Sequence, residues 1–367
     1  MKLSPSRREM FIKVTQAHGV SGYESEISKV LKSYYEGYCD EIIYDNLGSI
    51  YAVKKSKTKN PVRVMVAAHM DEVGFRVGKI NGDGTLKFSN VPSGIWEQVV
   101  MTSRLTIKTQ TGEHIPGVVN AIAPHRLTPE LRAKPLPVNM MIVDVGCSSA
   151  DEVKKLGINI GDTVVLDGEF VELNGGKRLL SKAFDNRYGC LMTIEALKAL
   201  KGVELPYDLY IGADVQEEVG CRGAQTAANM IKPDFAIVLD CSPAMDTSGD
   251  ASGSGDGLGH LGQGVLNRFG DGSFIAFPQL LAWQREMCDK CNVPYQYFSS
   301  TGGTDAGLIH KSNAGVLTLT HCICARNIHT SGSIIDLGDY DGAQKVLVAM
   351  LRALSAKQIE QFKESSR

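Results

Sequence analysis

The spacing of apolar and polar residues divides the chain into three stretches of different texture. Near the N-terminus, residues 1–16 and 25–38 have helical spacing, and the first segment places Met10 and Phe11 on one side. Residues 49–55 alternate between apolar and polar, whereas residues 62–69 form an almost continuous apolar run. This pattern predicts two helices, a half-buried strand and a fully buried strand.

The middle of the chain, residues 76–174, consists of short alternating runs separated by turns. Two dipeptides of the hairpin type follow one another at 81–84. Ser149 and Glu152 have the spacing of a capping box, which predicts one short helix. Residues 123–137 contain four prolines and therefore predict a loop. We expect an all-β module here.

From residue 175 onward, helical segments alternate with apolar strand-like runs. Such alternation is typical of βαβ units, which build a mostly parallel sheet. The helices are predicted at 188–200, 223–231, 278–291 and 339–359, and the strands at 208–215, 234–242 and 314–322.

The first and third stretches both combine predicted helices with apolar strands, whereas the second consists mainly of short alternating strands. We therefore predict an α/β fold, a three-layer sandwich with a mostly parallel central sheet, interrupted by an inserted β domain. The predicted limits are 1–75 and 175–367 for the two parts of the α/β domain and 76–174 for the insertion.

Composition narrows the class of protein. The chain has 367 residues, and its 39 Lys and Arg against 41 Asp and Glu give a net charge of −2, which argues against nucleic acid or anionic membranes as partners. No apolar run approaches the roughly 18 residues that cross a bilayer. The first residues lack the pattern of a signal peptide, and 9 cysteines are scattered along the chain. We expect reduced thiols and a cytoplasmic location.

Metal-binding residue types gather where predicted strands end. In open α/β sheets, sites form at the carboxyl ends of the strands, so these side chains are expected at one edge. They are His69 and Asp71 after the first buried strand, Asp185 before a helix, the pair Glu217 and Glu218, Asp240, and His329.

Each of these residues also has an ordinary structural interpretation. Asp185 could cap a helix, and the paired glutamates could lie on a solvated face. Asp240 could form an Asx turn, and His329 could be a core histidine with its hydrogen bonds made. Their joint occurrence at one edge favours a site instead.

Two histidines and at least three carboxylates are the ligands that a pair of divalent cations requires. These ligand types suit zinc, cobalt or manganese. One carboxylate must lie between two cations that are about 3.5–4 Å apart. Another must stay free of the metals to accept a proton from water. Adjacent glutamates can fill both roles, since one can bind while its neighbour acts as a base.

Several motifs resemble metallopeptidase family forty-two, the glutamyl aminopeptidase, cellulase-M-like and tetrahedral aminopeptidase group. They are AAHMDEVGF, SKAFDNRYGCLM, QEEVGCRGA, VLDCSPAMD, GGTDAG and ARNIHTSG, and the resemblance covers essentially the whole chain. It implies that one metal is held by His69, Asp185 and Asp240. It implies that the other is held by Asp185, Glu218 and His329, with Asp185 bridging.

The resemblance also implies that Glu217 is the general base and that Asp71 orients His69. A cis peptide between Asp185 and Asn186 follows from the same resemblance. So does a PDZ-like β-barrel that pairs subunits into dimers, which assemble into a tetrahedral dodecamer.

The expected activity is that of a di-metal aminopeptidase with zinc or cobalt, removing N-terminal residues from peptides and preferring Glu or Asp. Arg268 or Arg326 could supply the cationic pocket for an acidic side chain, although Arg326 could equally be a surface charge. The alternatives are a deacylase or carboxypeptidase with the same site, a broad leucyl-type aminopeptidase, a glycan hydrolase, and a peptide-binding scaffold without catalysis. The other histidines receive no catalytic role: His18, His114, His125, His260, His310 and His321.

Overall fold

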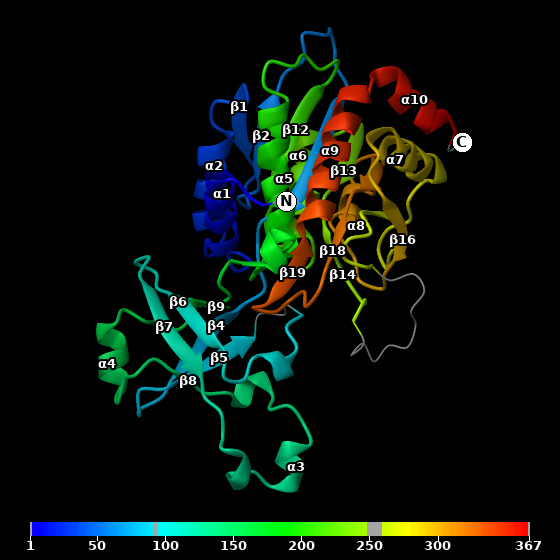
Figure 1. Ribbon diagram of the computed structural model, residues 1–367. Coiled ribbons are helices and arrows are strands. Elements are labelled where there is room, and N and C mark those ends of the chain that lie inside the picture. Colours follow the sequence, from blue (N-terminus) through cyan, green and yellow to red (C-terminus); the bar gives the residue numbers. More distant parts are fainter. Residues whose placement is uncertain (1, 91–93, 248–258, 366–367) are drawn as a thin grey trace.

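A computed structural model of the chain describes residues 2–90, 94–247 and 259–365. Its main body is built on a six-stranded sheet in the order β1-β2-β12-β3-β13-β17 (Figure 1). These strands are β1 (Glu41–Tyr44), β2 (Ile50–Lys54), β3 (Arg63–His69), β12 (Asp208–Asp214), β13 (Phe235–Val238) and β17 (Leu317–Thr320).

The centre of this sheet is parallel and its edge is antiparallel. β3 pairs in parallel with both β12 and β13, and β13 pairs in parallel with β17. β2 runs antiparallel to β1 and β12. The side chains from Val64 to Ala68 on β3 are fully buried, as a strand covered on both faces requires. The mostly parallel sheet predicted from the sequence is confirmed.

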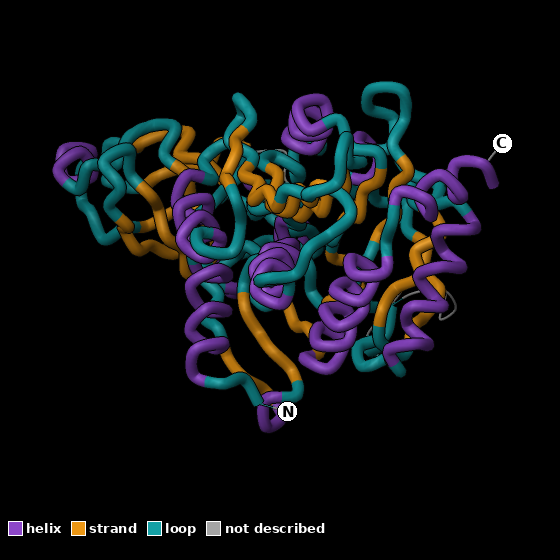
Figure 2. The backbone as a smooth tube through the Cα atoms, turned by 90° about the horizontal axis from the view of Figure 1, so that it is seen from above, coloured by secondary structure: helices purple, strands orange, loops and turns teal. Residues whose placement is uncertain are grey.

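Helices cover both faces of the sheet (Figure 2). On one face α5 contacts β3 and β12, and α1, α2 and α9 pack against α5, while α7 packs against α9. On the other face α6 contacts β3 and β12, and α8 contacts α6 and β17. The bounds are α1 (Pro5–Gln16), α2 (Ser25–Tyr35), α5 (Phe184–Ala199), α6 (Arg222–Ile231), α7 (Pro278–Cys291), α8 (Ala306–Ile309) and α9 (Leu337–Ala353).

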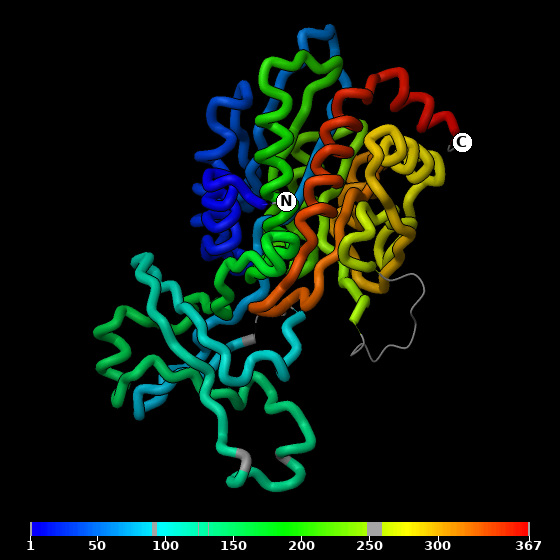
Figure 3. The backbone as a smooth tube through the Cα atoms, in the orientation of Figure 1, coloured from blue at the N-terminus to red at the C-terminus, as the bar shows by residue number. Residues whose placement is uncertain are grey.

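The inserted module is a closed antiparallel barrel in the order β4-β5-β8-β7-β6-β9. It has a hydrophobic core of its own, which includes Phe75, Leu105, Ile107 and Val164. Figure 3 shows it to one side of the main body. Its strands are β4 (Phe75–Ile80), β5 (Leu86–Asn90), β6 (Arg104–Lys108), β7 (His114–Val119), β8 (Val143–Asp144) and β9 (Thr163–Leu166).

The barrel also carries the short helix α4 (Ala150–Lys155). Its first turn is capped as predicted, because the backbone N–H of Glu152 donates to Ser149 Oγ at 3.3 Å. The limits 76–174 for the insertion stay a prediction. Strand β10 (Val171–Leu173) falls within that range and pairs with β11 (Arg178–Ser181), which pairs with β19 (Ser333–Asp336).

Smaller elements complete the fold. Among the described residues, no helix has the length and apolar character that crossing a bilayer demands. The remaining strands are β14 (Cys241–Pro243) with β18 (Ile323–Ala325) and β15 (Val265–Gly270) with β16 (Tyr295–Ser299), and the remaining helical segments are η1 (Glu97–Val99), η2 (Pro124–Arg126), α3 (Pro129–Arg132), η3 (Val138–Met140), η4 (Asn174–Gly176) and α10 (Ala356–Ser365).

Two local predictions were wrong. The segment 339–359 is not one helix, because α9 ends at Ala353 and α10 begins at Ala356. Ser355 lies at the break, and its hydroxyl accepts from the backbone N–H of Gln358, which caps the new helix. The proline-rich segment 123–137 is not only a loop, since it contains two short helical turns.

Candidate metal centre

Three parallel neighbours of the central sheet deliver the site residues to one edge. β3 ends at His69, which lies opposite Asp214 at the end of β12. The glutamate pair follows β12, and Asp240 comes two residues after the end of β13. The loops that leave these strands therefore bring together residues far apart in the sequence.

Asp185 is the centre of the arrangement. One of its carboxylate oxygens, Oδ1, lies 3.1 Å from His69 Nε2, and the other, Oδ2, lies 3.3 Å from His329 Nε2. The peptide bond between Asp185 and Asn186 is cis, as the family resemblance implied. Asp185 does not cap α5, since the N-cap position is Ala183. A single carboxylate thus joins both predicted histidines.

Two groups of possible ligands share this carboxylate. The first is His69, Asp185 and Asp240, and the second is Asp185, Glu218 and His329. Within each group the ligand atoms all lie within 4.8 Å of one another. His329 Nε2 is 3.3 Å from Glu218 Oε2, and His69 Nε2 is 3.7 Å from Asp240 Oδ1. The structure brings all five predicted ligands into one place.

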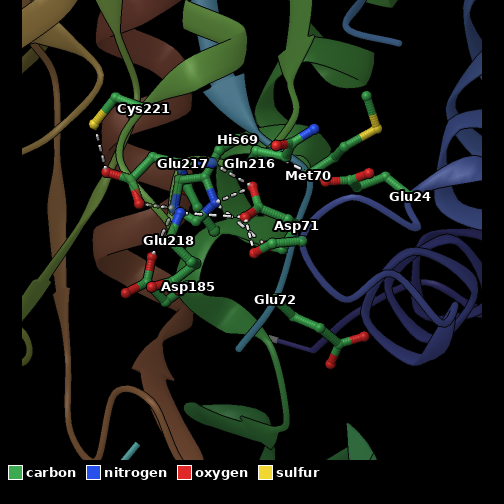
Figure 4. A network of polar contacts seen from close by, with 12 residues as sticks. Glu24, His69, Met70, Asp71, Glu72, Asp185, Gln216, Glu217, Glu218 and Cys221 are labelled. Atoms are coloured by element: carbon green, nitrogen blue, oxygen red, sulfur yellow. Dashed lines mark hydrogen bonds and ion pairs between the residues drawn. The ribbon is translucent and has the colours of Figure 1, made fainter. Parts of the chain in front are cut away.

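Glu217 lies beside the two groups, and together with His69 and Glu218 it forms a further set of possible ligands. Its Oε2 is 3.8 Å from His69 Nε2, and its Oε1 accepts a hydrogen bond from the Cys221 thiol (Figure 4). Burial raises the pKa of Glu217 above its ordinary value, and the charges of Asp71 and Asp185 raise it further. A carboxylate in this position can hold a proton more readily than an exposed one.

Asp71 is fully buried and lies beside His69 (Figure 4). Its Oδ1 lies 3.4 Å from His69 Nδ1. The backbone N–H groups of Glu217 and Glu218 donate to its two oxygens at 3.0 and 3.2 Å, and Ser21 Oγ donates at 2.6 Å. Burial alone would raise the pKa of Asp71, but the hydrogen bonds and the imidazole lower it overall. The family resemblance implied the contact with His69 but not the contacts with the glutamate backbone.

The electrostatics of the site fit divalent cations. Burial raises the pKa values of Glu218 and Asp240 well above their ordinary range, and the nearby carboxylates add to this. Glu218 Oε1 is buried without a hydrogen-bond partner. Crowded carboxylates of this kind need a compensating positive charge. Oxygen and imidazole donors are the ligands that zinc, cobalt and manganese accept.

Comparison with known proteins adds a decisive observation. The profile of the M42 glutamyl aminopeptidase family matches residues 48–346. The chain belongs to this family. It is therefore a metallo-aminopeptidase, a peptidase whose family implies metal ions.

Relatives of this M42 aminopeptidase differ in the specificity that their names state. The glutamyl aminopeptidase of Lactococcus lactis subsp. cremoris is 39% identical over 366 residues, covering 97% of this chain and 99% of the relative. The lysyl aminopeptidase of Pyrococcus furiosus is 31% identical, covering 94% of this chain and 97% of the relative.

Solved structures agree with the fold. The TET aminopeptidase of the marine sediment archaeon Thaumarchaeota archaeon SCGC AB-539-E09 is similar with a TM-score of 0.91 and 34% identity, covering 96% of this chain and 98% of that one. The Pyrococcus horikoshii TET1 peptidase, described as able to assemble into a tetrahedron or a large octahedral shell, is similar with a TM-score of 0.82 and 28% identity, covering 94% of this chain and 99% of that one.

A buried ion pair that the sequence did not predict lies next to the centre. Glu72 follows Asp71 and is only 3% exposed. Lys182 Nζ lies 2.8 and 2.7 Å from its two carboxylate oxygens, and Arg187 NH2 lies 3.4 Å from one of them. Lys182 and Arg187 flank Asp185 in sequence, so their contacts with Glu72 hold the backbone on both sides of Asp185.

The two arginines considered for an acidic pocket already have carboxylate partners. Arg268 is buried, and its NH2 lies 2.9 Å from Asp271 Oδ2. Arg326 makes a bidentate contact with Asp246: its Nε donates to Oδ1 at 2.6 Å and its NH2 donates to Oδ2 at 2.8 Å. Neither guanidinium is therefore free of a carboxylate partner, and a role of either in an acidic pocket stays a prediction. The sequence could not show the partner of Arg326, which lies 80 residues away, whereas Asp271 is only three residues from Arg268.

A cleft opens beside the centre on the side of the barrel. Asp185, His329 and Lys182 line it from the main body, and Ile95 and Leu166 line it from the barrel.

Proposed function

We propose that this M42 aminopeptidase removes N-terminal residues from peptides with two divalent cations, zinc or cobalt. One cation would be held by His69, Asp185 and Asp240. The other would be held by Asp185, Glu218 and His329. When bound, such ions supply Lewis acidity for the scissile carbonyl and lower the pKa of water. The observation that carries the proposal is the position of Asp185, whose two oxygens face the two histidines.

Glu217 is proposed as the general base. Its carboxylate accepts a proton from the attacking water and later donates it to the leaving amine. Its raised pKa supports this role, since a base works best when its pKa lies near the working pH.

Asp71 is proposed as a positioning residue. It faces His69 Nδ1 and accepts from the backbone N–H groups of both glutamates. It would thereby hold one imidazole ligand and the base in a fixed relation. Outer partners of metal ligands commonly act in this way.

A preference for acidic N-terminal residues is proposed from the relative named as a glutamyl aminopeptidase, which is 39% identical. Another relative, at 31% identity, is named as a lysyl aminopeptidase. Substrates with a basic N-terminal residue should therefore be tested alongside acidic ones. Since Arg268 and Arg326 have carboxylate partners, they do not support the acidic preference. Comparing kcat/KM for glutamyl, leucyl and lysyl anilides tests this. A leucyl or lysyl preference would overturn it.

We also propose that the chain forms a homo-oligomer, with barrel-mediated dimers that assemble into a tetrahedral dodecamer. The similarity to a TET1 peptidase that forms such shells supports this. Light scattering of the purified protein measures the mass directly, and a monomer would overturn it. A cytoplasmic location is proposed because all 9 cysteines are free thiols, as is usual in a reducing compartment.

The activity is tested with aminoacyl anilides before and after chelation. We expect chelation to abolish hydrolysis and added zinc or cobalt to restore it. Blocking the substrate's amino group should prevent cleavage by an aminopeptidase. A deacylase or carboxypeptidase would still accept the blocked peptide, and a metal-independent glycan hydrolase would not respond to the chelator.

A further inference from the structure

Another group of possible ligands lies on one side of the proposed metal pair. It consists of Glu217, Cys221 and Asp305, each offering one ligand atom, and these atoms all lie within 4.8 Å of one another. The Cys221 thiol donates to Glu217 Oε1 at 3.3 Å, and Figure 4 shows the thiol directed at that carboxylate. The proposed function assigns no role to Cys221 or Asp305.

Asp305 is the unusual member of this group. Its side chain is buried, with 1% of the residue exposed, and neither of its carboxylate oxygens has a hydrogen-bond partner among the described residues. Burial raises its pKa well above the ordinary value, and Asp214 and Glu217 raise it further. A buried carboxylate without donors needs either a proton or a cation.

The proposed metal pair does not supply the missing charge. Two divalent cations would balance the four carboxylates Asp185, Glu217, Glu218 and Asp240. Asp305 is an additional acid beyond these four. Asp214 adds to the excess, because one of its oxygens is also buried without a partner. This side of the site is therefore able to attract a further cation.

We propose that Glu217, Cys221 and Asp305 form a third, inhibitory site for a thiophilic divalent cation such as zinc or cadmium. Ligand bonds of about 2.0–2.3 Å in tetrahedral geometry place neighbouring ligand atoms roughly 3.6 Å apart. The distance of 3.3 Å between Cys221 Sγ and Glu217 Oε1 is close to this value. Binding would release the thiol proton to solvent, and water would complete the coordination.

The inhibitory effect rests on the proposed role of Glu217. A carboxylate that binds a cation through its oxygens is a weak proton acceptor, so the base would be lost while the metal pair stayed in place. The ion can reach the site, because Glu217 and Cys221 are both partly exposed. A thiolate ligand selects soft cations over magnesium or calcium.

The test is a cadmium titration of the full-length protein loaded with two equivalents of zinc. Thiolate-to-cadmium charge-transfer absorption and the bound metals after desalting are both measured. We expect one further equivalent of cadmium, a thiolate band and retention of the zinc. Cys221→Ser should lose the band and keep basal activity, since a serine hydroxyl can still donate to Glu217. The matched controls are Cys39→Ser and Cys147→Ser, because these are the other two partly exposed cysteines.

Asp305→Asn is the second variant. It keeps the thiol but loses a ligand, so cadmium affinity should fall by at least about tenfold, the loss that even an outer partner of a ligand can cause. The concentration of cadmium that halves activity should rise by a similar factor in this variant and in Cys221→Ser.

A band that survives in Cys221→Ser, or a wild-type protein without a band, overturns the site. A lost band with unchanged inhibition overturns the inhibitory role. Because absorption and metal content do not depend on turnover, an inactive zinc-loaded protein would overturn the proposed function and leave the third site to be judged from cadmium binding.

Discussion

Single side chains at the centre act through very few contacts. The main chain of Glu217 is fixed by a hydrogen bond from its backbone N–H to Asp71. Its carboxylate faces His69 and Cys221. The position of Glu217 therefore depends on its main chain, whereas its ability to accept a proton depends on its carboxylate. A substitution that changes only the carboxylate separates these two properties.

Glu217→Gln should leave metal content unchanged and lower kcat by about 10²–10⁴-fold, the usual contribution of a general base. The amide has almost the same shape but cannot accept the proton. Anilide hydrolysis and elemental analysis measure the two quantities, with Glu113→Gln on the exposed β6–β7 turn as the matched control. Turnover at the wild-type rate would show that another residue is the base.

Asp71→Asn should reduce metal affinity or activity by about 10–100-fold, as is usual for an outer partner of a ligand. An asparagine offers one acceptor oxygen, whereas Asp71 uses both oxygens for the glutamate backbone and Ser21. Metal dissociation constants and kcat are measured separately. Unchanged values in both would contradict the positioning role.

The sequence indicated which candidate side chains come together more completely than it indicated their surroundings. His69 ends β3, the glutamate pair follows β12 and Asp240 follows β13, so strand prediction was enough to group them. The partner of Glu72 is Lys182, and nothing in the sequence pairs residues so far apart. Asp305 was visible only as part of a glycine-rich segment, because its lack of partners is a property of the folded chain.

At the level of elements, the buried ion pair joins segments on either side of the inserted barrel. Glu72 precedes β4, and Lys182 follows β11. Arg187, on the first turn of α5, donates to the backbone carbonyls of Met70, Val14 and Ala17. These contacts hold the loop after β3 against α5 and the N-terminal helix.

Glu72→Gln should lower the free energy of unfolding by about 3–5 kcal/mol, because it leaves a buried ammonium without its counter-charge. Urea unfolding measures the change. The double variant Glu72→Gln/Lys182→Met removes both charges and should recover most of the loss. Equal stability of the single and double variants would show that the pairing contributes little.

Element prediction succeeded where one pattern ran without interruption. The apolar run at 62–69 became β3, and the helical segment at 278–291 became α7. It failed where a single residue redirected the chain, as at Ser355 between α9 and α10. The partners of β10 also could not be predicted, since strand pairing depends on the whole fold.

At the scale of the whole molecule, two histidines outside the site are buried in neutral form. His321 Nε2 lies 2.8 Å from the carbonyl oxygen of Ala343, and its Nδ1 lies 3.1 Å from Gln284 Nε2. Burial lowers the pKa of His321 to about 4. Burial and nearby lysines lower the pKa of His18 to about 3.

Stability should therefore fall as the pH drops from about 6.5 toward 4. Unfolded histidine takes up a proton near pH 6.5, whereas folded His321 does so only near its pKa of about 4. Between these values the unfolded state binds more protons, so acid favours unfolding. His321→Gln should flatten the pH dependence of unfolding by up to about 3 kcal/mol across this range. The exposed His125→Gln is the control, and an identical slope in both variants would contradict the assignment.

The position of the barrel within the chain has a consequence for synthesis on the ribosome. β3 is complete at residue 69, but its neighbours β12 and β13 begin only at residues 208 and 235. The intervening 138 residues (208 − 70) require roughly 7–28 s at about 5–20 residues per second. Once residue 166 has been made, the barrel has all of its strands and its own hydrophobic core, whereas β3 still has no partner strand in the main sheet. The nascent chain must therefore shield β3 by other means until the second half of the protein emerges.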